Sequence, residues 1–216
     1  MIFLQYIKQQ IIRKRLRNKG IHVDKAALVS KNALVGKGSS VHRFAAIGGD
    51  TELGENVRVG SYASISRIRA GNNTIIEHGV KCTGHGEGRI AIGKESYIGL
   101  MNILDFSNDI TIGDYVHIAG PSTALWTHTS APMAFKGIPA SERDPESRPT
   151  APIVVEHNVY IGGNCTVYPG VTIGHHSLVA PNSAVTKDVE PYTMVGGVPA
   201  RFIKHLNRDA ETEIRS

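Results

Sequence analysis

Residues 23–65 read VDKAALVSKNALVGKGSSVHRFAAIGGDTELGENVRVGSYASI, and a large aliphatic residue stands at every sixth position of this stretch. The register holds through Val23, Val29, Val35, Val41, Ile47, Leu53, Val59 and Ile65. A small or β-branched residue follows four positions after all but the last: Ala27, Ala33, Ser39, Ala45, Thr51, Val57 and Ala63. A period of six is a multiple of the two-residue strand repeat but not of the 3.6-residue helix repeat. The stretch therefore predicts short strands.

The same period runs through most of the remaining chain. It slips after Ile65 and resumes at Ala70, Ile76 and Cys82, then at Ile92, Ile98 and Leu104, at Ile112 and Ile118, and finally at Val155, Ile161, Val167, Ile173, Val179 and Val185. Glycine often follows the aliphatic residue, as at Gly36, Gly60 and Gly162. We expect these glycines to supply the relaxed backbone angles of a tight corner.

These features predict a β-solenoid. Three six-residue units would close one triangular coil of about 18 residues, and successive coils would stack by parallel strand pairing. The aliphatic residues would fill a narrow core without space for rings, which agrees with an aromatic content of 6%. A β-sandwich would need a turn about every 8–12 residues rather than every six.

Three regions depart from the repeat, so we divide the chain into 1–20, 21–190 and 191–216. Residues 2–19 predict a helix, in which Phe3, Leu4, Ile7, Ile11 and Ile12 share a face and Gly20 acts as a stop. Residues 126–152 form an insertion that carries five of the ten prolines, and an ordered loop of this length is usually functional. Residues 191–207 leave the repeat and are expected to cap its open end.

The net charge of +5 is concentrated in the predicted helix. Residues 1–20 contain six Lys and Arg and no acid, and removing those six from 24 leaves 18 basic against 19 acidic residues elsewhere. The body therefore lacks the basic footprint of a nucleic-acid-binding protein. The helix would lie either on an anionic membrane or on a neighbouring subunit.

Several cellular locations are disfavoured by the sequence. No apolar run approaches the roughly 20 residues of a membrane-spanning helix, and the first residues do not resemble a secretory signal. Cys82 and Cys165 stand far apart within the repeat, which favours two buried, reduced thiols. We expect a cytoplasmic protein, with peripheral contact at the inner face of the membrane as a further option.

Residues 159–204, VYIGGNCTVYPGVTIGHHSLVAPNSAVTKDVEPYTMVGGVPARFIK, resemble the hexapeptide-repeat acyltransferases. The subgroup that looks nearest comprises the galactoside and maltose O-acetyltransferases and the polysaccharide and lipopolysaccharide O-acetyltransferases. The specific likeness covers about residues 90–204. It implies a left-handed parallel β-helix, a homotrimer, and acetyl-CoA bound in the groove between adjacent subunits.

The resemblance assigns a catalytic base and its neighbours. His128, in the segment LWTHTSAP, stands where the family has its catalytic histidine, and an imidazole with a pKa near 6.5 suits the removal of a proton from a sugar hydroxyl. Asn102 and Asp105, in LMNILDFSND, are candidates to orient the acceptor or the imidazole, although a ladder asparagine and a corner aspartate are as plausible. Trp126, the single tryptophan, is a candidate to wall the acceptor site or simply to pack within the loop.

The resemblance also assigns the cofactor side. Tyr160 replaces a tryptophan common in the family, Gly163 would allow close backbone approach, and Ala180 and Pro181 would flank the pantetheine, with Pro181 a departure because it lacks an N–H. The phosphates would meet Thr186, Lys187, Arg201 and Lys204.

No catalytic metal is expected. Zinc enzymes on this fold resemble one another in a pair of histidines five apart, and no two of the ten histidines here have that spacing. Three functions follow from the sequence. The first is O-acetylation of a sugar hydroxyl on a cell-surface polysaccharide or its precursor. The second is acetylation of a small diffusible glycoside, amino sugar or antibiotic. The third is a non-catalytic trimeric scaffold, which the histidine and the cations disfavour.

Overall fold

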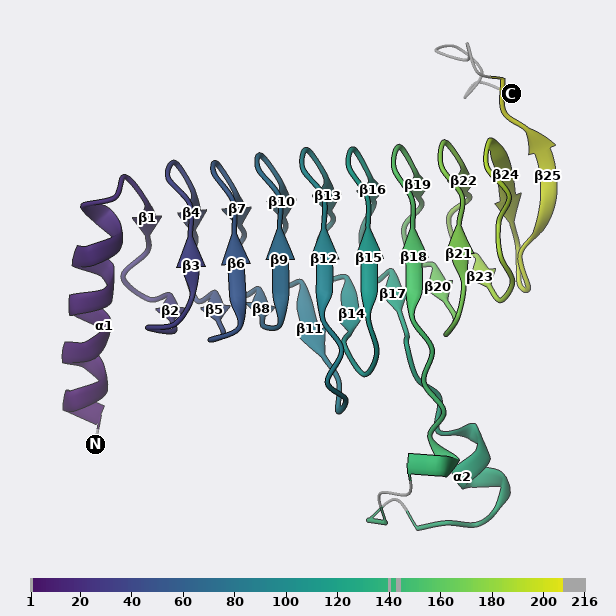
Figure 1. The fold of residues 1–216 in the computed structure, drawn as a ribbon, viewed down its shortest axis with the longest axis horizontal. Helices are drawn as coiled ribbons and strands as arrows, with labels where there is room; N and C mark the ends of the chain where they lie inside the picture. Colours follow the sequence, from purple (N-terminus) through teal and green to yellow (C-terminus); the bar gives the residue numbers. More distant parts are fainter. Residues whose placement is uncertain (1, 140, 143–144, 208–216) are drawn as a thin grey trace.

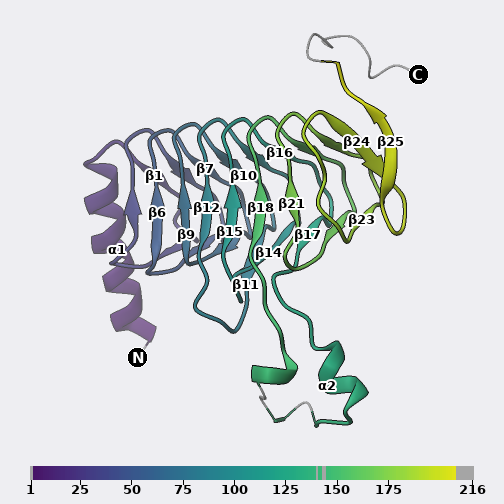
Figure 2. The ribbon, with the colours of Figure 1, turned by 45° about the vertical axis from the view of Figure 1, so that its right-hand side comes forward.

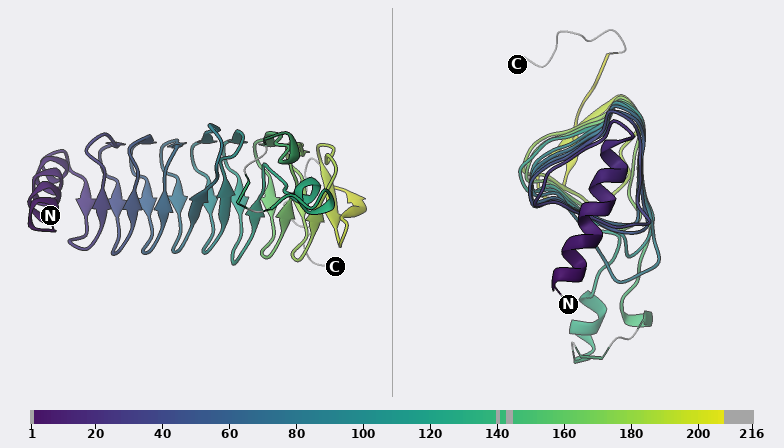
Figure 3. Two further views of the ribbon diagram at one scale, coloured as in Figure 1. Left: turned by 90° about the horizontal axis from the view of Figure 1, so that it is seen from below. Right: turned by 90° about the vertical axis from the view of Figure 1, so that its left-hand side faces the viewer.

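Short strands wind around one long axis in the computed structural model, which describes residues 2–139, 141–142 and 145–207 (Figure 1). Within these residues the strands form three sheets of ten, eight and seven members. Each turn of the chain visits the first, the second and then the third sheet, so the strands form a parallel β-helix. Its fold is the left-handed β-helix of the hexapeptide repeat, as predicted. The end-on view in Figure 3 shows the three-sided cross-section.

The strand bounds follow the six-residue repeat. The first sheet contains β1 (His22–Val23), β4 (Ser40–Val41), β7 (Arg58–Val59), β10 (Ile75–Ile76), β13 (Tyr97–Ile98), β16 (His117–Ile118), β19 (Tyr160–Ile161), β22 (Leu178–Val179), β24 (Thr193–Gly196) and β25 (Arg201–His205). The second contains β2 (Leu28–Val29), β5 (Ala46–Ile47), β8 (Ser64–Ile65), β11 (Lys81–Thr83), β14 (Ile103–Asp105), β17 (Ala124–Leu125), β20 (Thr166–Val167) and β23 (Ala184–Val185). The third contains β3 (Leu34–Val35), β6 (Thr51–Leu53), β9 (Ile68–Ala70), β12 (Ile90–Ile92), β15 (Ile110–Ile112), β18 (Ile153–Val155) and β21 (Thr172–Ile173).

The turns between the sheets define three corners of the coil. We call them the first corner, between the first and second sheets, the second corner, between the second and third sheets, and the third corner, where the chain returns to the first sheet. A regular coil takes 18 residues, as in the pairing of Ser40 with Arg58. Longer coils carry insertions, and the longest separates His117 from its partner Tyr160.

The core is a column of stacked aliphatic side chains. Val41, Val59, Ile76, Ile98 and Ile118, on successive strands of the first sheet, are all completely buried. The other two sheets add equivalent columns, and the largest fully buried side chains are all isoleucine or leucine. In the part of the chain that the structure describes, the core is aliphatic and holds no rings, as the low aromatic content predicted. Tyrosines at the corners, such as Tyr62 and Tyr115, lie outside it.

The glycines that follow the aliphatic residues have a different role from the expected one. Gly60 and Gly162 do not have positive φ; the left-handed corner positions are held mainly by other residues, among them Asn158 and His176. A Cβ at Gly60 would lie 2.5 Å from the backbone nitrogen of His78 on the next coil. These glycines are therefore required by the close stacking of coils rather than by backbone angles.

Helix α1 (Ile2–Arg17) covers the N-terminal end of the β-helix (Figure 1). Its buried apolar side chains are Ile12 and Leu16, whereas Ile7 and Ile11 are 39% and 63% exposed, so the expected apolar face is wrong in part. The side chains of Phe3 and Leu4 lie outside the described residues. The expected apolar face is only partly buried because the helix turns Gln9 towards the first coil. The side-chain amide of Gln9 exchanges two hydrogen bonds of 3.1 Å with the backbone of Val29.

The insertion leaves the second corner between β17 and β18 and extends well away from the coils (Figure 2). It contains α2 (Ala131–Phe135) and the short 3₁₀ helix η1 (Pro145–Ser147). Its two ends are joined by a bridge between His128 and Thr150. This extruded loop was predicted from the sequence.

The C-terminal segment differs from the expectation that residues 191–207 leave the repeat. Strand β24 still pairs in parallel with β22, so it completes another coil, and only β25 reverses to pair antiparallel with β24. The reversal covers the C-terminal end of the first sheet. Within the described part of the chain, no helix is long and apolar enough to cross a lipid bilayer.

Candidate active site

A histidine and a buried carboxylate meet at the second corner, where the insertion begins. Asp105 is the last residue of β14, and His128 follows β17, which pairs with β14 on the next coil. The stacking of these strands brings together two residues that are 23 positions apart: His128 Nδ1 lies 2.6 Å from Asp105 Oδ2. The aspartate side chain is completely buried, whereas the histidine side chain retains 18% exposure.

The surroundings of Asp105 keep its carboxyl group ionised. Thr127 donates to Oδ2 from its backbone nitrogen at 2.9 Å and from its hydroxyl at 3.0 Å, and the Ser107 hydroxyl donates to Oδ1 at 2.7 Å. Burial alone would raise the pKa of Asp105, but the hydrogen bonds from His128 and Ser107 and the charge of the imidazole hold the pKa below its usual value. The group is therefore an acceptor that fixes the position of the imidazole.

Two contacts determine which imidazole nitrogen carries the proton. An ionised carboxylate can only accept, so Nδ1 of His128 must donate to Asp105. At the other side of the ring, a guanidinium nitrogen of Arg148 lies 3.2 Å from Nε2, and a guanidinium can only donate. Both contacts leave an unprotonated lone pair on Nε2, the state that a general base requires.

Trp126 forms one wall beside the imidazole. Its ring stands nearly perpendicular to that of His128, with centroids 6.2 Å apart and an interplanar angle of 84°. Trp126 is half-buried, and its backbone N–H donates a hydrogen bond to the carbonyl oxygen of Val167. The structure thus places the predicted acceptor-site tryptophan next to the predicted base.

Asn102, the third predicted catalytic residue, is placed differently from His128 and Asp105. Its amide nitrogen donates to the carbonyls of Ile118 and Ala119 at 3.2 Å each, and its Oδ1 accepts from the backbone of Thr123 at 2.9 Å. These bonds satisfy the side chain completely inside the coil, and the residue is fully buried. Among the described residues these hydrogen bonds do not include His128, and the geometry gives Asn102 a place in the corner ladder.

The predicted cofactor residues lie on other parts of the same coils. Gly163, Ala180 and Pro181 are at the first corner, whereas Thr186 and Lys187 are exposed at the second corner, after β23. A Cβ at Gly163 would lie 2.6 Å from the carbonyl oxygen of Gly120, so its lack of a side chain accommodates the preceding coil.

Three further residues of the set belong to the first sheet. Tyr160, in β19, is 41% exposed. Arg201 and Lys204 are on β25, where Arg201 is exposed and Lys204 is paired with Met194 of β24. One chain therefore assembles the base at the second corner but holds much of the predicted cofactor set on another face.

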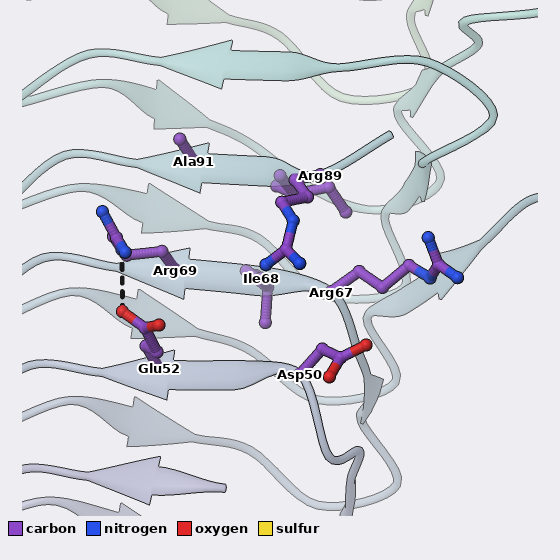
Figure 4. A pocket seen from close by; sticks show the side chains of 8 residues that line it. Asp50, Glu52, Arg67, Ile68, Arg69, Arg89 and Ala91 are labelled. Atoms are coloured by element: carbon purple, nitrogen blue, oxygen red, sulfur yellow. Dashed lines mark hydrogen bonds and ion pairs between the residues drawn. The ribbon is translucent and has the colours of Figure 1, made fainter. Parts of the chain in front are cut away.

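A separate hollow lies on the third sheet. It is lined by Asp50, Glu52, Arg67, Ile68, Arg69, Arg89, Ile90 and Ala91, and includes none of the predicted site residues. Figure 4 shows the ion pair between Arg69 and Glu52, with the Arg89 side chain extending over Ile68. The guanidinium of Arg67 is 5.5 Å from the Phe106 ring centroid, so the hollow borders the coil that carries Asp105.

Three residues of the active site were not selected from the sequence. Ser107 and Thr127 had a local signal, because each is within two residues of a predicted site residue in chain order. Arg148 had none, since it lies 20 residues beyond His128 within the insertion, and only the folding of that loop returns it to Nε2.

Comparison with known proteins gives a consistent relationship. The family model described as bacterial transferase hexapeptide (six repeats) matches residues 152–187. A protein of Escherichia coli (strain K12) assigned as a lipopolysaccharide biosynthesis O-acetyl transferase is 31% identical over 50% of this chain and 64% of its own length. The galactoside O-acetyltransferase of the same organism is 35% identical over 55% of each chain. The chain thus spans less than two thirds of the length of these relatives.

A solved structure shows the same fold over nearly the whole chain. The polySia specific acetyltransferase NeuO superposes with a TM-score of 0.55, covering 90% of this chain and 92% of that one at 22% identity. At this identity the likeness shows the fold alone, and the relationship rests on the repeat and the sequence matches. The chain belongs to the hexapeptide-repeat transferase family.

Proposed function

We propose that this chain is an acetyl-CoA-dependent O-acetyltransferase that modifies a sugar hydroxyl of a cell-surface polysaccharide or its precursor. The observation that carries the proposal is the buried Asp105 holding His128 through Nδ1, which leaves Nε2 unprotonated at a partly exposed position. The names of the sequence relatives, O-acetyltransferases of lipopolysaccharide biosynthesis and of galactosides, support the reaction class.

The proposed reaction is direct transfer without an acyl-enzyme. His128 Nε2 would remove the proton of the acceptor hydroxyl as its oxygen attacks the thioester carbonyl, and Asp105 would stabilise the imidazolium that forms. Collapse of the tetrahedral intermediate breaks the C–S bond, and the thiolate of coenzyme A takes the proton back from Nε2. The guanidinium of Arg148 now occupies this side of the ring, at 3.2 Å, so the acceptor hydroxyl must displace it.

We place the cofactor between subunits of a homotrimer. The base lies at the second corner, whereas Gly163, Ala180 and Pro181 lie at the first corner of the same coils. In a trimer, the first corner of one subunit would face the second corner of its neighbour. Thr186, Lys187, Arg201 and Lys204 would then supply the contacts to the phosphates.

A small glycoside is the second candidate acceptor. It is favoured by the likeness to a galactoside O-acetyltransferase, whose name states such a substrate. A screen with labelled acetyl-CoA against free sugars, oligosaccharides and lipid-linked glycans separates the two candidates. Labelling of lipid-linked or polymeric glycans supports the first, and labelling confined to free glycosides supports the second.

The basic helix α1 is proposed to hold the protein, otherwise cytoplasmic, at the inner face of the membrane. Tyr6, Ile7 and Ile11 are exposed beside Lys8 and Lys14, whereas Gln9 and Arg15 hydrogen-bond to the first coil. Replacing Ile7 and Ile11 with glutamate should abolish sedimentation with vesicles that contain anionic lipid. Equal sedimentation of this variant and the wild type would remove the membrane proposal.

The role of the base is tested directly by His128→Ala. We expect the rate of acetyl transfer to fall by about 10²–10⁴-fold, since this is the usual contribution of a positioned base. Binding of acetyl-CoA, measured by calorimetry, should be retained. The exposed His22 on the first coil provides the control, and His22→Ala should keep full activity. Near-normal turnover of His128→Ala would refute the assignment.

A further inference from the structure

Three histidines meet at the third corner, outside the active site. His157 belongs to the turn between β18 and β19, and His175 and His176 belong to the equivalent turn of the next coil. Each can offer one ring nitrogen such that all three atoms lie within 4.8 Å of one another. Nδ1 of His175 and Nδ1 of His176 are only 3.0 Å apart.

The repeat explains why these side chains converge. His157 and His175 are one regular coil apart, so they occupy the same position of the corner, and their rings stack with centroids 5.0 Å apart and an interplanar angle of 2°. His176 is the next residue, held in the left-handed conformation at φ 58°, which turns its ring nearly perpendicular to both of the others. The corner thus brings two parallel rings and one perpendicular ring together, with one nitrogen of each close to the other two.

Other side chains fix the orientation of this cluster. Glu156 accepts a hydrogen bond from the backbone of His175 at 2.8 Å, and Asn158 lies 3.0 Å from Nε2 of His176 through its side-chain amide. On the following coil, the ring of Tyr192 stacks on that of His176 with centroids 4.8 Å apart. The three imidazoles are therefore held by contacts from three successive coils.

We infer that His157, His175 and His176 form a binding site for a late first-row divalent metal ion, of which Zn²⁺ is the natural candidate. Three neutral imidazoles are a ligand set that zinc, nickel and cobalt accept, with a fourth position left for water. Two metal–nitrogen bonds of about 2.0–2.1 Å that span 3.0 Å meet at an angle of about 95°, so a small separation of the two rings gives tetrahedral geometry.

The site is separate from the acetyl-transfer site. His128 and the insertion are at the second corner, whereas the three histidines are at the third; in Figure 1 the insertion extends below the β-helix and the turns between the third and first sheets lie along its upper edge. A metal here would join two coils near the C-terminal end of the solenoid. We therefore assign it a stabilising role that does not depend on the proposed reaction.

The test is metal binding by the full chain without an affinity tag. Titration with Zn²⁺ in a calorimeter should give one site per chain, and Co²⁺ should give the visible absorption of a nitrogen-ligated ion. The variants His157→Asn, His175→Asn and His176→Asn should each weaken binding by about tenfold or more. Asparagine suits these positions because it stands at equivalent ones on earlier coils, Asn72 for His157 and His175 and Asn73 for His176.

Two further variants make the result specific. His78→Asn removes an exposed histidine at the first corner of an earlier coil and should leave Zn²⁺ affinity unchanged. Asn158→Asp should tighten binding, because a carboxylate opposite Nε2 of His176 would accept its proton and leave Nδ1 free for the metal. Asn164→Asp, at the first corner, adds the same charge elsewhere and serves as its control.

Thermal unfolding provides the second measurement. Zn²⁺ should raise the melting temperature of the wild type and not that of His176→Asn, since a ligand stabilises only a fold that binds it. Binding that is unchanged in all three histidine variants, or lost equally in His78→Asn, would overturn the site. Acetyl transfer should be the same with and without a chelator, so failure of the metal proposal and failure of the proposed function are distinguished.

Discussion

Asp105 illustrates how much a single buried carboxylate determines at the scale of the residue. It accepts hydrogen bonds from Thr127, Ser107 and His128 while its side chain is completely buried. A buried acceptor of this kind is stable only while every partner is present. The same contacts that fix the second corner therefore also fix the tautomer of the imidazole.

Asp105→Asn should separate geometry from tautomer. The amide that replaces the carboxylate can donate to Nδ1, and the neutral imidazole would then carry its proton on Nε2, where it cannot act as a base. We expect kcat to fall by about 10²–10⁴-fold while KM for acetyl-CoA changes little. Steady-state kinetics of the two proteins measure both quantities. A variant with unchanged kcat would show that the carboxylate does not set the tautomer.

The acid stability of the protein should also depend on Asp105. Because the pKa of this carboxyl is lower in the folded chain than its usual value of about 3.9, its stabilising effect is complete above that value and is lost as the pH falls through the folded pKa. The difference in unfolding free energy between the wild type and Asp105→Asn should therefore shrink below about pH 4. Urea unfolding at pH 7 and pH 3.5 measures it, and a gap that widens in acid would contradict this account.

At the scale of the element, helix α1 caps the β-helix, and its hydrophobic pattern predicts only part of the face that it buries. Ile12 and Leu16 are 9% and 3% exposed, and they cover the end of the aliphatic column. Gln9 replaces the missing strand neighbour of Val29 with its side-chain amide. The helix is therefore bound to its own first coil through hydrogen bonds from Gln9 and Arg15 and through the buried side chains of Ile12 and Leu16.

A pair of substitutions tests this cap. Leu16→Ala should lower the free energy of unfolding by about 2–5 kcal/mol, the usual cost of truncating a buried leucine. Ile11→Ala is the matched control, because Ile11 is 63% exposed and its truncation should change stability by less than about 0.5 kcal/mol. Equal effects of the two changes in chemical unfolding would show that α1 does not pack as described.

At the scale of the whole molecule, the corners of the β-helix separate its functions. The second corner carries the base and the insertion, the first corner carries much of the predicted cofactor set, and the third corner carries the histidine cluster. Since a flat face of the solenoid lies between two corners, one chain alone does not bring the proposed base and the predicted pantetheine contacts together. A second copy is the simplest way to close the site.

Mixed trimers provide a test of shared sites. One variant would carry His128→Ala, and the other would carry Arg201→Ala and Lys204→Ala, both on β25; each should be inactive alone. If base and cations come from different subunits, random mixing of equal amounts restores about a quarter of the sites, because a site needs an intact residue from each partner. Co-expression followed by activity measurement tests this, and no recovery would indicate that each chain holds a complete site.

The sequence alone determined the solenoid, because a strict six-residue aliphatic period has one physical solution, a column of inward-facing side chains on stacked coils. It also marked the helix, the insertion and the position of His128. Only the tertiary structure decided which residues surround that histidine. Asp105 meets it because two strands lie in register, whereas Asn102, three positions earlier, turns into the corner ladder.

Contacts between coils and loops, which only the tertiary structure sets, also explain why Arg148 reaches His128 and why the three histidines meet. The spacing of five concerns the catalytic zinc site of related enzymes and does not address contact between histidines, since residues one coil apart stack directly, as His157 and His175 do. Gly60 and Gly162 follow the same logic, because their lack of a side chain serves a neighbour on the next coil. In a solenoid the sequence shows what each unit places inside, but contacts between units depend on the length of each coil and on where each insertion returns.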